Sequence, residues 1–411
     1  MCIRDSSKIS GINSTKISGT LPALDGSALT NLTAGNLEGT LPTLDGSPLT
    51  GVQGFRKNSS DPLVNSNGTQ GDVWVNTASA EVYVLTDATT DANVWTNVGD
   101  GTGTQPFTGM VATGGTITTD GDYKVHTFNS SDPFEVTTLG DVGTVEVLVV
   151  AGGGSGGSGY GGGGGAGGIV HHTSKTVSEA SFSVVVGAGG SSVTAGGSDG
   201  NTGNDSSVFS MTSKGGGFAG GYNRASGDGG SGGGESTGNA ANTEKGSTNQ
   251  GAVSGATVYG NNGGEHNQTG AWHAAGGGGA GAVGGAPDNS GSNGANGFAG
   301  DGGAGEFFAN FTHAGTSGTN TGTSGGYFAG GGGGGSEAFS AFANYLNGGD
   351  GGAGGGGDHY LGNNNIGPGG DGATNTGGGG AGATHYFTTG SGRPATGAGG
   401  SGIVMIRYKF Q

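Results

Sequence analysis

Residues that could do covalent or metal chemistry are few and scattered in this chain. Gly153 to Gly157 (GGSGG) matches the G-x-S-x-G pattern, in which a serine nucleophile sits on a turn between a strand and a helix. No helix is predicted after this segment, so we attribute the match to the glycine content. His171 and His172 would point to opposite sides of a strand, and no further ligand is placed to complete a metal site. The sequence therefore predicts no catalytic centre, metal or cofactor.

Acidic residues and the one cysteine lead to the same prediction. Gly196 to Asp205 (GGSDGNTGND) is similar to a calcium-binding repeat, but the spacing does not recur, which favours solvated turns. A polysaccharide-cleaving enzyme would need a pair of carboxylates. Glu306 and Glu337, which lie among aromatic residues, are the acids that such an enzyme would use. Cys2 has no second cysteine with which to form a disulfide.

Glycine runs dominate the second part of the chain, so they must form the scaffold that positions the segments between them. Glycine makes up about a third of residues 151–411, in runs such as Gly161 to Gly168 and Gly330 to Gly335. Collagen is excluded because glycine does not recur at every third position. A disordered linker is disfavoured because strand-like segments flank the runs. The remaining structure is a bundle of polyglycine II helices, which are extended threefold helices that bond to their neighbours.

Composition and charge exclude two classes of partner. The chain has 13 basic and 30 acidic side chains, a formal net charge of −17, and an apolar fraction of 30%. Binding to nucleic acid through its phosphates needs the opposite charge balance. The longest apolar block, Val145 to Ala151, is far shorter than a membrane-spanning helix and contains Glu146. We therefore expect no nucleic acid and no insertion into a membrane.

The first part of the chain, residues 1–54, reads as a fibre-like repeat segment. Ile17 to Leu32 and Leu37 to Val52 repeat the order Leu-Pro, Asp-Gly-Ser, Leu-Thr. Such repeats cannot bury their leucines alone, so we expect them to stack on sister chains in a homotrimer. The opening MCIRDSSKIS lacks the apolar segment of a signal peptide, and its authenticity as a start is open.

Residues 55–105 are predicted to form a small β-module. Val73 to Asn76, Glu81 to Thr86 and Asn93 to Asn97 have the residue types and flanking turns of strands. Trp74 and Trp95 could be platforms for sugar stacking, but in so small a unit we favour them as its core.

Residues 106–411 are predicted to form a mainly β, glycine-rich domain. Strands within 113–190, together with 402–410, would frame the glycine-rich insert as a sheet or sandwich. The final strand must pair somewhere, and the simplest partner is one of the first strands. The strand-like segments are Asp122 to Phe128, Pro133 to Thr138, Val145 to Ala151, Ala180 to Gly190 and Gly402 to Phe410.

The order of these segments resembles that of bacteriophage tail fibres. GTVEVLVVAGGGSGGSGYGGGGGAGG, the later VVVGAGG and the ending GAGGSGIVMIRY are similar to the glycine-rich domains at the distal ends of such fibres. The likeness runs from about Thr113 to Gln411. The LPALDGSALT repeats and the GDVWVNT and VWTNVG segments also look like parts of tail fibre proteins. One departure is that fibre-like and adhesin-like parts share one chain here, whereas the adhesin of T-even-type tips is a separate protein.

The resemblance implies a polyglycine II bundle whose distal loops touch a host receptor. The inserts between the glycine runs would then be those loops. Aromatic side chains offer large contact areas at low entropic cost and stack on sugars. The alternative is that each aromatic residue caps the bundle and shields its edges, which we favour for any single residue but not for the whole set. The candidates are Tyr259, His266, Trp272, His273, Phe307, Phe308, Phe311, His313, Tyr327, Phe328, Phe339, Phe342, Tyr345, His359, Tyr360, His385, Tyr386 and Phe387.

The function expected from these features is attachment and not catalysis. The chain would be a virion protein, located in the tail fibre and therefore extracellular. Its partners would be a host surface glycan or outer-membrane protein and other tail proteins. The alternative is a structural, extracellular glycine-rich matrix protein of cellular origin. A matrix protein should repeat its inserts, whereas the inserts here differ in length and content, which favours adhesion.

Overall fold

The computed structural model describes residues 54–99, 109–194, 196–238, 243–266, 273–288, 297–316, 325–338, 348–359, 367–386 and 394–411. The predicted repeat segment therefore lies outside the described residues, apart from Gly54. The chain divides into two compact units, Met1–Thr104 and Gln105–Gln411. As predicted, the fold is mainly β, and the described elements are short strands and the 3-10 segment η6 (Ala309–Phe311).

In unit 1, the described strands form one four-stranded sheet in the order β1-β2-β3-β4. β1 is parallel to β2, and the other neighbours are antiparallel. The sheet buries Trp74, whose ring lies 5.7 Å from that of Trp95 in an edge-on arrangement. Both tryptophans thus contribute to the core. The strands are β1 (Phe55–Asn58), β2 (Val73–Asn76), β3 (Val82–Asp87) and β4 (Val94–Gly99).

The other face of this sheet carries apolar side chains that the described residues leave uncovered. Side chains alternate between the two faces of a strand, so Val94 and Val98 lie on the face opposite to Trp95. Val94 is 50% exposed, Val98 58% and Phe55 64%. One face of the small sheet therefore lacks a packing partner within the described residues.

Unit 2 is built around a six-stranded sheet in the order β14-β10-β9-β19-β7-β6. The final strand, β19, lies between β9 and β7 and is antiparallel to both, which confirms the predicted pairing of the last strand with the first ones. The strands are β6 (Thr116–Asp120), β7 (Tyr123–Phe128), β9 (Thr144–Val150), β10 (Ile169–Thr176), β14 (Thr257–Tyr259) and β19 (Ile403–Lys409).

Smaller sheets complete unit 2. A three-stranded sheet has the order β11-β8-β5, and three further pairs are β12 with β13, β15 with β16 and β17 with β18. The strands are β5 (Val111–Thr113), β8 (Asp132–Thr138), β11 (Ser181–Val184), β12 (Ser206–Val208), β13 (Met211–Ser213), β15 (Glu306–Phe307), β16 (Tyr327–Phe328), β17 (Glu337–Ala338) and β18 (His385–Tyr386).

The six-stranded sheet buries both of its faces. Alternation along β9 sends Val147 and Val149 into a core shared with Phe134 of β8. Leu148 and Val150 point the other way, into a second core. This sheet, with the three-stranded sheet packed on it, is called the framework below. It explains why β9 reads as a continuous apolar run, since neither face meets water.

The glycine runs continue from the framework strands and form a lattice with a repeat of three residues. The run Gly152–Ser158 follows β9 directly, and its amides donate in turn to three different neighbouring segments. Gly152 donates to Asn204, and three residues later Ser155 donates to the same segment. A return to the same neighbour at every third residue is the geometry of a threefold extended helix, that is, polyglycine II. The three acceptor segments are residues 198–204, 397–400 and 162–165.

The run Gly161–Gly168 lies at the centre of this lattice. Its amides donate to residues 214–220, 275–278 and 377–380, and its carbonyls accept from residues 151–157, 231–234 and 332–335. Six neighbours therefore surround it, and every residue from Ala151 to Val170 is buried. The backbone polar groups are satisfied without side chains, so glycine itself is the core residue.

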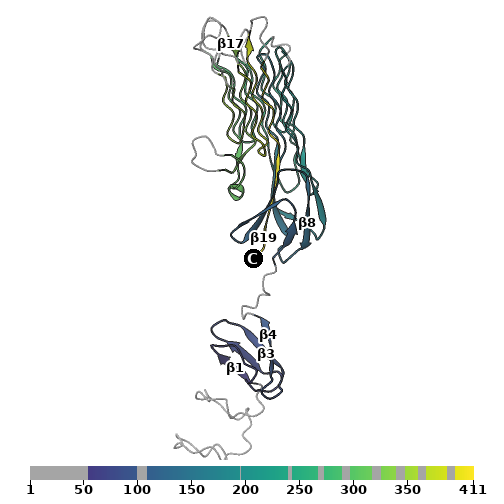
Figure 1. Cartoon of the computed structure of the whole chain (residues 1–411), viewed down its shortest axis with the longest axis vertical. Helices are drawn as coiled ribbons and strands as arrows, with labels where there is room; N and C mark the ends of the chain where they lie inside the picture. The colour runs from purple at the N-terminus through teal and green to yellow at the C-terminus, as the bar shows by residue number, and fades with distance from the viewer. Residues whose placement is uncertain are drawn as a thin grey trace, which may run out of the picture. The chain divides into compact units, whose positions relative to one another are not determined.

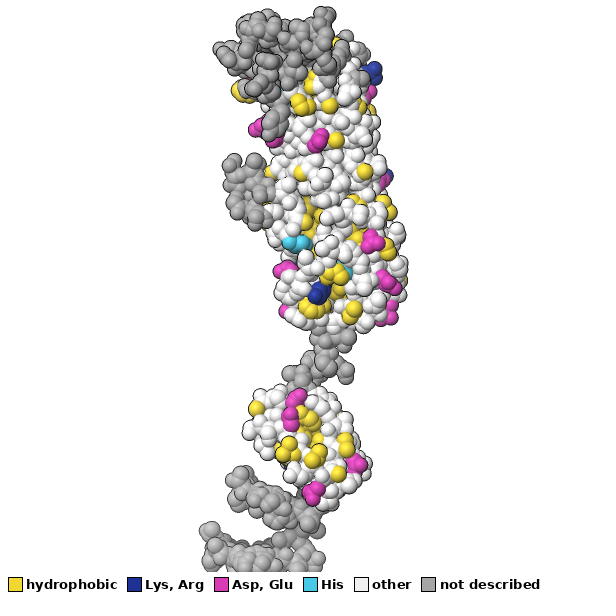
Figure 2. All heavy atoms as spheres, viewed as in Figure 1, with side chains coloured by type: hydrophobic (Ala, Val, Ile, Leu, Met, Phe, Trp, Pro, Cys, Tyr) yellow, Lys and Arg dark blue, Asp and Glu magenta, His cyan; other side chains and the backbone are white. Residues whose placement is uncertain are grey.

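Close approach explains why these positions are glycine. A methyl group added to Gly164 would stand closer than 3.0 Å to backbone atoms of Gly154 and Ser155. The bundle extends away from the framework, with β19 and β8 near one end and β17 at the other (Figure 1). Its surface is mostly backbone and small polar side chains, with scattered acidic groups (Figure 2).

Candidate functional site

The residues predicted for recognition fall in two separate places in unit 2. Some lie beside the framework, and others lie at the opposite end of the bundle, here called the loop end, which holds β17 and β18 (Figure 1). For His385 and Tyr386 the description covers the backbone, in β18, and not the side chain. Six candidates lie outside the described residues: Trp272, Phe339, Phe342, Tyr345, Tyr360 and Phe387.

The hairpin of β15, η6 and β16 folds back onto the framework and buries three of the candidates. Phe308 is 6% exposed, and Phe311 and Phe328 are fully buried. They share a core with Leu148 and Ile403 of the six-stranded sheet. Because buried rings cannot touch a receptor, we correct the prediction for these three residues and assign them to packing.

Glu146 on β9 anchors this hairpin. Its Oε1 lies 3.0 Å from His171 Nε2, and Asn310 Nδ2 donates to Oε1 and Oε2 at 3.1 and 2.9 Å. Burial of Glu146 acts to raise its pKa, but the hydrogen bonds from His171 and Asn310, together with the charges of His171 and Arg407, outweigh burial, so the pKa is lowered. The carboxylate therefore stays ionised and holds the hairpin in place. The His171 ring also contacts Phe308 edge-on, at 5.0 Å.

The remaining candidates of this region stay partly accessible. The half-buried Tyr259 of β14 contacts Phe308 edge-on at 5.6 Å. Phe307, 37% exposed, lies 5.1 Å from the ring of Tyr327. The His313 side chain is exposed. These side chains lie on the hairpin or, for Tyr259, beside it, and they are separated from the loop end by the length of the bundle (Figure 1).

The loop end is where the chain repeatedly leaves and re-enters the bundle. Ala274 donates to Gly335, Gly349 donates to Gly334, and β17 pairs with β18 in parallel. These contacts bring the described flanks of many inserts together. The inserts whose flanks meet here are residues 239–242, 267–272, 289–296, 339–347, 360–366 and 387–393. Every candidate that lies outside the described residues belongs to one of these inserts.

A buried histidine supports the roots of two inserts. His359, 8% exposed, has its Nε2 3.0 Å from Thr384 Oγ1, which donates to the carbonyl of Gly367 at 3.1 Å. The bond therefore runs from His359 Nε2–H to the hydroxyl. Burial, with a smaller effect of His273, lowers the pKa of His359 to about 4. His273 is 2% exposed and forms a backbone bridge with Ser336. Both histidines are part of the base of the loop end and not of its surface.

A buried carboxylate joins two other insert roots. Glu235 is 6% exposed and accepts hydrogen bonds from Thr243 Oγ1 at 2.9 Å and from the backbone amide of His266 at 2.7 Å. Thr243 follows the insert 239–242, and His266 precedes the insert 267–272. The His266 side chain is half-buried, and desolvation lowers its pKa. One side chain thus positions the ends of two inserts.

Glu235, Ser336 and Thr384 were not among the candidates predicted from the sequence. Glu235 and Ser336 directly follow glycine runs, and Thr384 follows the glycine- and alanine-rich segment 377–383. A polar residue at the point where a run ends is therefore the signal that could have found them. The side chains of Glu235 and Thr384 contribute hydrogen bonds to insert roots, and Ser336 contributes its backbone bridge to His273, which is positioning and not recognition.

The structure shows where the residues that match catalytic patterns lie. Ser155 is fully buried inside a glycine run, and its Oγ accepts from the backbone amide of Asn201. Glu306 pairs with Phe328, whereas Glu337 follows at the far end of the run that begins there. At about 3.1 Å per residue these two glutamates are on the order of 25 Å apart. Paired carboxylates of glycosidases are at most about 10 Å apart, so the two cannot form such a pair.

The acidic residues of the segment 196–205 accept hydrogen bonds from neighbouring segments. Asp205 accepts from the amide of Gly215 at 2.9 Å and from Lys214 Nζ at 2.8 Å, and Asp199 accepts from the amide of Gly221 at 3.1 Å. These carboxylates cap neighbouring segments. Within the described ranges, no three His, Cys, Asp or Glu side chains converge as a metal site would require. The same ranges contain no helix long and apolar enough to span a membrane.

Comparison with known proteins identifies a family for the bundle and most of the framework. A model of the glycine-rich domain family matches residues 127–409. The match begins within β7 and ends at the last residue of β19, so it covers the glycine runs and most framework strands, while β5 and β6 precede it. No curated protein matches the chain. Since the matched region is more than half of the chain, the protein belongs to the glycine-rich domain family.

Proposed function

We propose that this chain is a non-enzymatic receptor-binding protein of a bacteriophage tail fibre, which attaches the virion to a host surface through the inserts of the loop end. The observation that carries this proposal is the meeting of insert flanks at one end of the bundle. Trp272, Phe339 and Tyr360 belong to different inserts, yet the described flanks of all three inserts lie there. Recognition residues far apart in sequence are thus rooted together.

The lattice gives these inserts a rigid base. Each buried run is held by hydrogen bonds to several neighbours, and Glu235 and His359 tie insert roots to one another. Loops on a rigid scaffold are the usual carriers of binding function. A base that is ordered before binding reduces the entropy lost when the receptor is bound. Several copies on one virion would add avidity.

The chemistry of the inserts suits a glycan or an outer-membrane protein. Insert 339–347 reads FSAFANYLN and insert 360–366 reads YLGNNNI, so aromatic rings alternate with small and amide side chains. Such mixtures bind sugars and protein loops by stacking and by adaptable hydrogen bonds. The six loop-end inserts also differ in length and content, which supports adhesion over the repetitive inserts of a matrix protein.

Replacement of one insert tests the proposal. Residues 339–347 are exchanged for a Gly-Ser segment of equal length, and binding of the fluorescently labelled full chain to a panel of Gram-negative strains is measured by flow cytometry. The matched control exchanges residues 317–324, whose flanks Thr316 and Gly325 lie in the hairpin beside the framework. We expect the first variant to lose at least about tenfold in binding and the control to keep it.

Two outcomes would contradict the proposal. If the unaltered protein binds no strain of the panel, attachment to bacterial surfaces is not its function. If it binds but both variants bind equally well, the loop end does not carry the attachment.

A further inference from the structure

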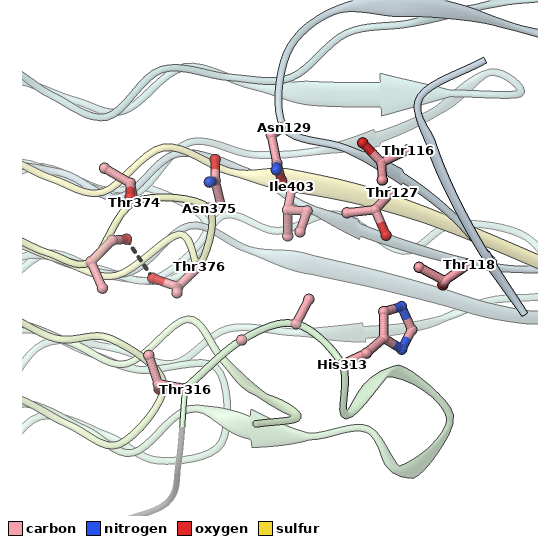
Figure 3. A pocket seen from close by; sticks show the side chains of 13 residues that line it. Thr116, Thr118, Thr127, Asn129, His313, Thr316, Thr374, Asn375, Thr376 and Ile403 are labelled. Carbon is pink, nitrogen blue, oxygen red and sulfur yellow. Dashed lines mark hydrogen bonds between the residues drawn. The ribbon is translucent and has the colours of Figure 1, made fainter. Parts of the chain in front are cut away.

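A second polar site lies beside the framework, in a cavity of about 550 Å³. Three pieces of chain that are far apart in sequence form it: β6 with β7, the hairpin residues 313–316, and a turn of the bundle at 373–376. Figure 3 shows Thr116, Thr118 and Thr127 on the side of the sheet, with His313 facing them from the hairpin. We call it the threonine cavity.

The walls of the threonine cavity offer hydroxyl groups, amide groups and the imidazole of His313, and the described residues add no permanently charged side chain. None of the described residues that line it is Asp, Glu, Lys or Arg. Thr116, Thr118 and Asn129 are exposed, and Asn375 is half-buried. These groups can donate and accept hydrogen bonds, but they cannot neutralise an ion. The cavity therefore suits a neutral ligand that carries many hydroxyl groups.

Part of the cavity lining is apolar. Ala314 and Ala373, both half-buried, line it together with Ile403, which is 1% exposed. A sugar ring presents both hydroxyl groups and faces of C–H groups, so it needs polar walls together with an apolar surface. The volume also falls within the range of small-molecule sites, about 300 to 1,000 Å³.

Two hydroxyl groups at the cavity have no partner within the protein. Thr127 Oγ1 and Thr316 Oγ1 are buried, and neither makes a hydrogen bond in the described structure. Buried hydroxyl groups are normally paired, so each one calls for an explanation. A rotation of χ1 by about 120° moves the hydroxyl of a threonine to the place held by its methyl group or its Cβ hydrogen. Such a rotation gives each hydroxyl a route to a group held in the cavity.

From these observations we propose that the threonine cavity binds a neutral saccharide. Sugar hydroxyls would pair with Thr116, Thr118 and the amides, and one face of the ring would pack on Ala314 and Ala373. The site is separate from the loop end, and it does not depend on attachment through the inserts.

The test uses the full chain and a panel of glucose, galactose, mannose, N-acetylglucosamine and glucuronate, with binding followed by saturation-transfer NMR and calorimetric titration. The variant Thr116→Val with Thr118→Val removes two hydroxyls while keeping side-chain shape, and valine suits a strand. Thr119→Val is the matched control, because Thr119 is on the same strand, faces the other side and accepts from Lys124 Nζ at 2.8 Å. A second variant, Asn129→Ala, removes an amide from an exposed bend outside the strands.

We expect at least one neutral sugar to bind the unaltered protein. The double variant should bind this sugar about tenfold or more weakly, and Asn129→Ala several-fold more weakly. The control variant should bind it as tightly as the unaltered protein. The proposal is overturned if no neutral sugar binds, if glucuronate alone binds, or if the double variant and Asn129→Ala both bind as tightly as the unaltered protein. The last result would place the sugar elsewhere, for example at the loop end.

Discussion

The framework and the glycine bundle of unit 2 both exclude water, but they do so with different groups. The framework buries side chains such as Phe134 and Val147 between two sheets. In the bundle, Gly161–Gly168 is buried by six neighbouring backbones and contributes almost no side chain. A protein interior therefore needs satisfied backbone groups and close contact, and large apolar side chains are one way, not the only way, to achieve it.

The two regions should consequently respond to substitution in opposite ways. A framework side chain can be made smaller, with a loss that depends on the cavity left behind. A residue of the central run cannot be made larger, because the space that a side chain needs is occupied by the backbone of its neighbours. The framework is sensitive to deletion of atoms, and the bundle is sensitive to addition.

The largest effect is expected from Gly164→Ala. The added methyl would stand closer than 3.0 Å to the backbone of Gly154 and Ser155, and these atoms cannot move without breaking the lattice. We expect a loss of at least about 4 kcal/mol in the free energy of unfolding, or failure to fold. Calorimetric unfolding measures it. Gly251→Ala is the matched control, because a methyl there meets no atom within 4 Å. Equal stability of the two variants would remove the distinction between bundle and framework.

A somewhat smaller loss is expected from Leu148→Ala. Leu148 is fully buried between the six-stranded sheet and the hairpin, next to Phe311 and Phe328. Deleting its side chain should lower the free energy of unfolding by about 3 kcal/mol without preventing folding. Denaturant titration checks this value. A loss below about 1 kcal/mol would mean that the hairpin does not pack on the sheet as described.

The loop end should lose stability in mild acid because of His359. Its pKa is about 4 in the folded protein, whereas an exposed histidine in the unfolded chain has a pKa near 6.5. The unfolded chain therefore binds an extra proton between these values, so stability is complete above pH 6.5 and falls as the pH falls towards 4. We expect this group to contribute a loss of about 2 kcal/mol between pH 7 and pH 5.

Unfolding of His359→Gln at the two pH values provides the comparison. The variant should lose about 2 kcal/mol less than the unaltered protein over this range. An unchanged pH dependence would assign the effect to other histidines, such as the framework residue His126, whose pKa is also lowered by burial.

The smallest effect on unfolding, but a clear effect on assembly, is expected in unit 1. Unlike the six-stranded sheet of unit 2, its sheet has a face with Val94 and Val98 that the described residues leave uncovered. If this face packs against sister chains in the expected homotrimer, Val94→Lys with Val98→Lys should give a monomer while changing unfolding by less than about 1 kcal/mol. Light scattering after size exclusion measures the mass. Leu63→Lys with Val64→Lys, each 65% exposed, is the control. A monomeric unaltered protein would contradict the prediction.

Much of the framework could be predicted from the sequence because its strands alternate or are wholly apolar. The segments VEVLVVA and GIVMIRYKF predicted β9 and β19, and the final strand was expected to pair with one of the first strands, as β19 does with β9. β10 (Ile169–Thr176) was not predicted, because only its first two residues are buried and the rest, HHTSKT, is polar. Its pairing with β9 depends on the glycine runs that bring the two strands together. The sequence of residues 169–176 alone does not predict that pairing.

The candidate site was predicted less well, because composition does not show at which end of the bundle an insert begins. Phe308, Phe311 and Phe328 have the same aromatic character as Phe339, yet the hairpin that carries them folds onto Leu148 and Ile403, far away in sequence. The residues that support the inserts were not predicted for another reason. The role of Glu235 depends on its hydrogen bonds with Thr243 and His266, which only the fold brings close to it.

The most direct test of the glycine bundle is native-state hydrogen exchange, read at the backbone amides of Gly161–Gly168 and compared with those of β9 and β19. Each of the amides from Gly162 to Gly168 donates to a neighbouring segment, so we expect them to exchange as slowly as the framework strands, near the limit set by global unfolding. Exchange of these amides at the rate of an unprotected chain, while β9 and β19 stay protected, would show that the glycine runs are not packed and would contradict the rigid base proposed for the loop end.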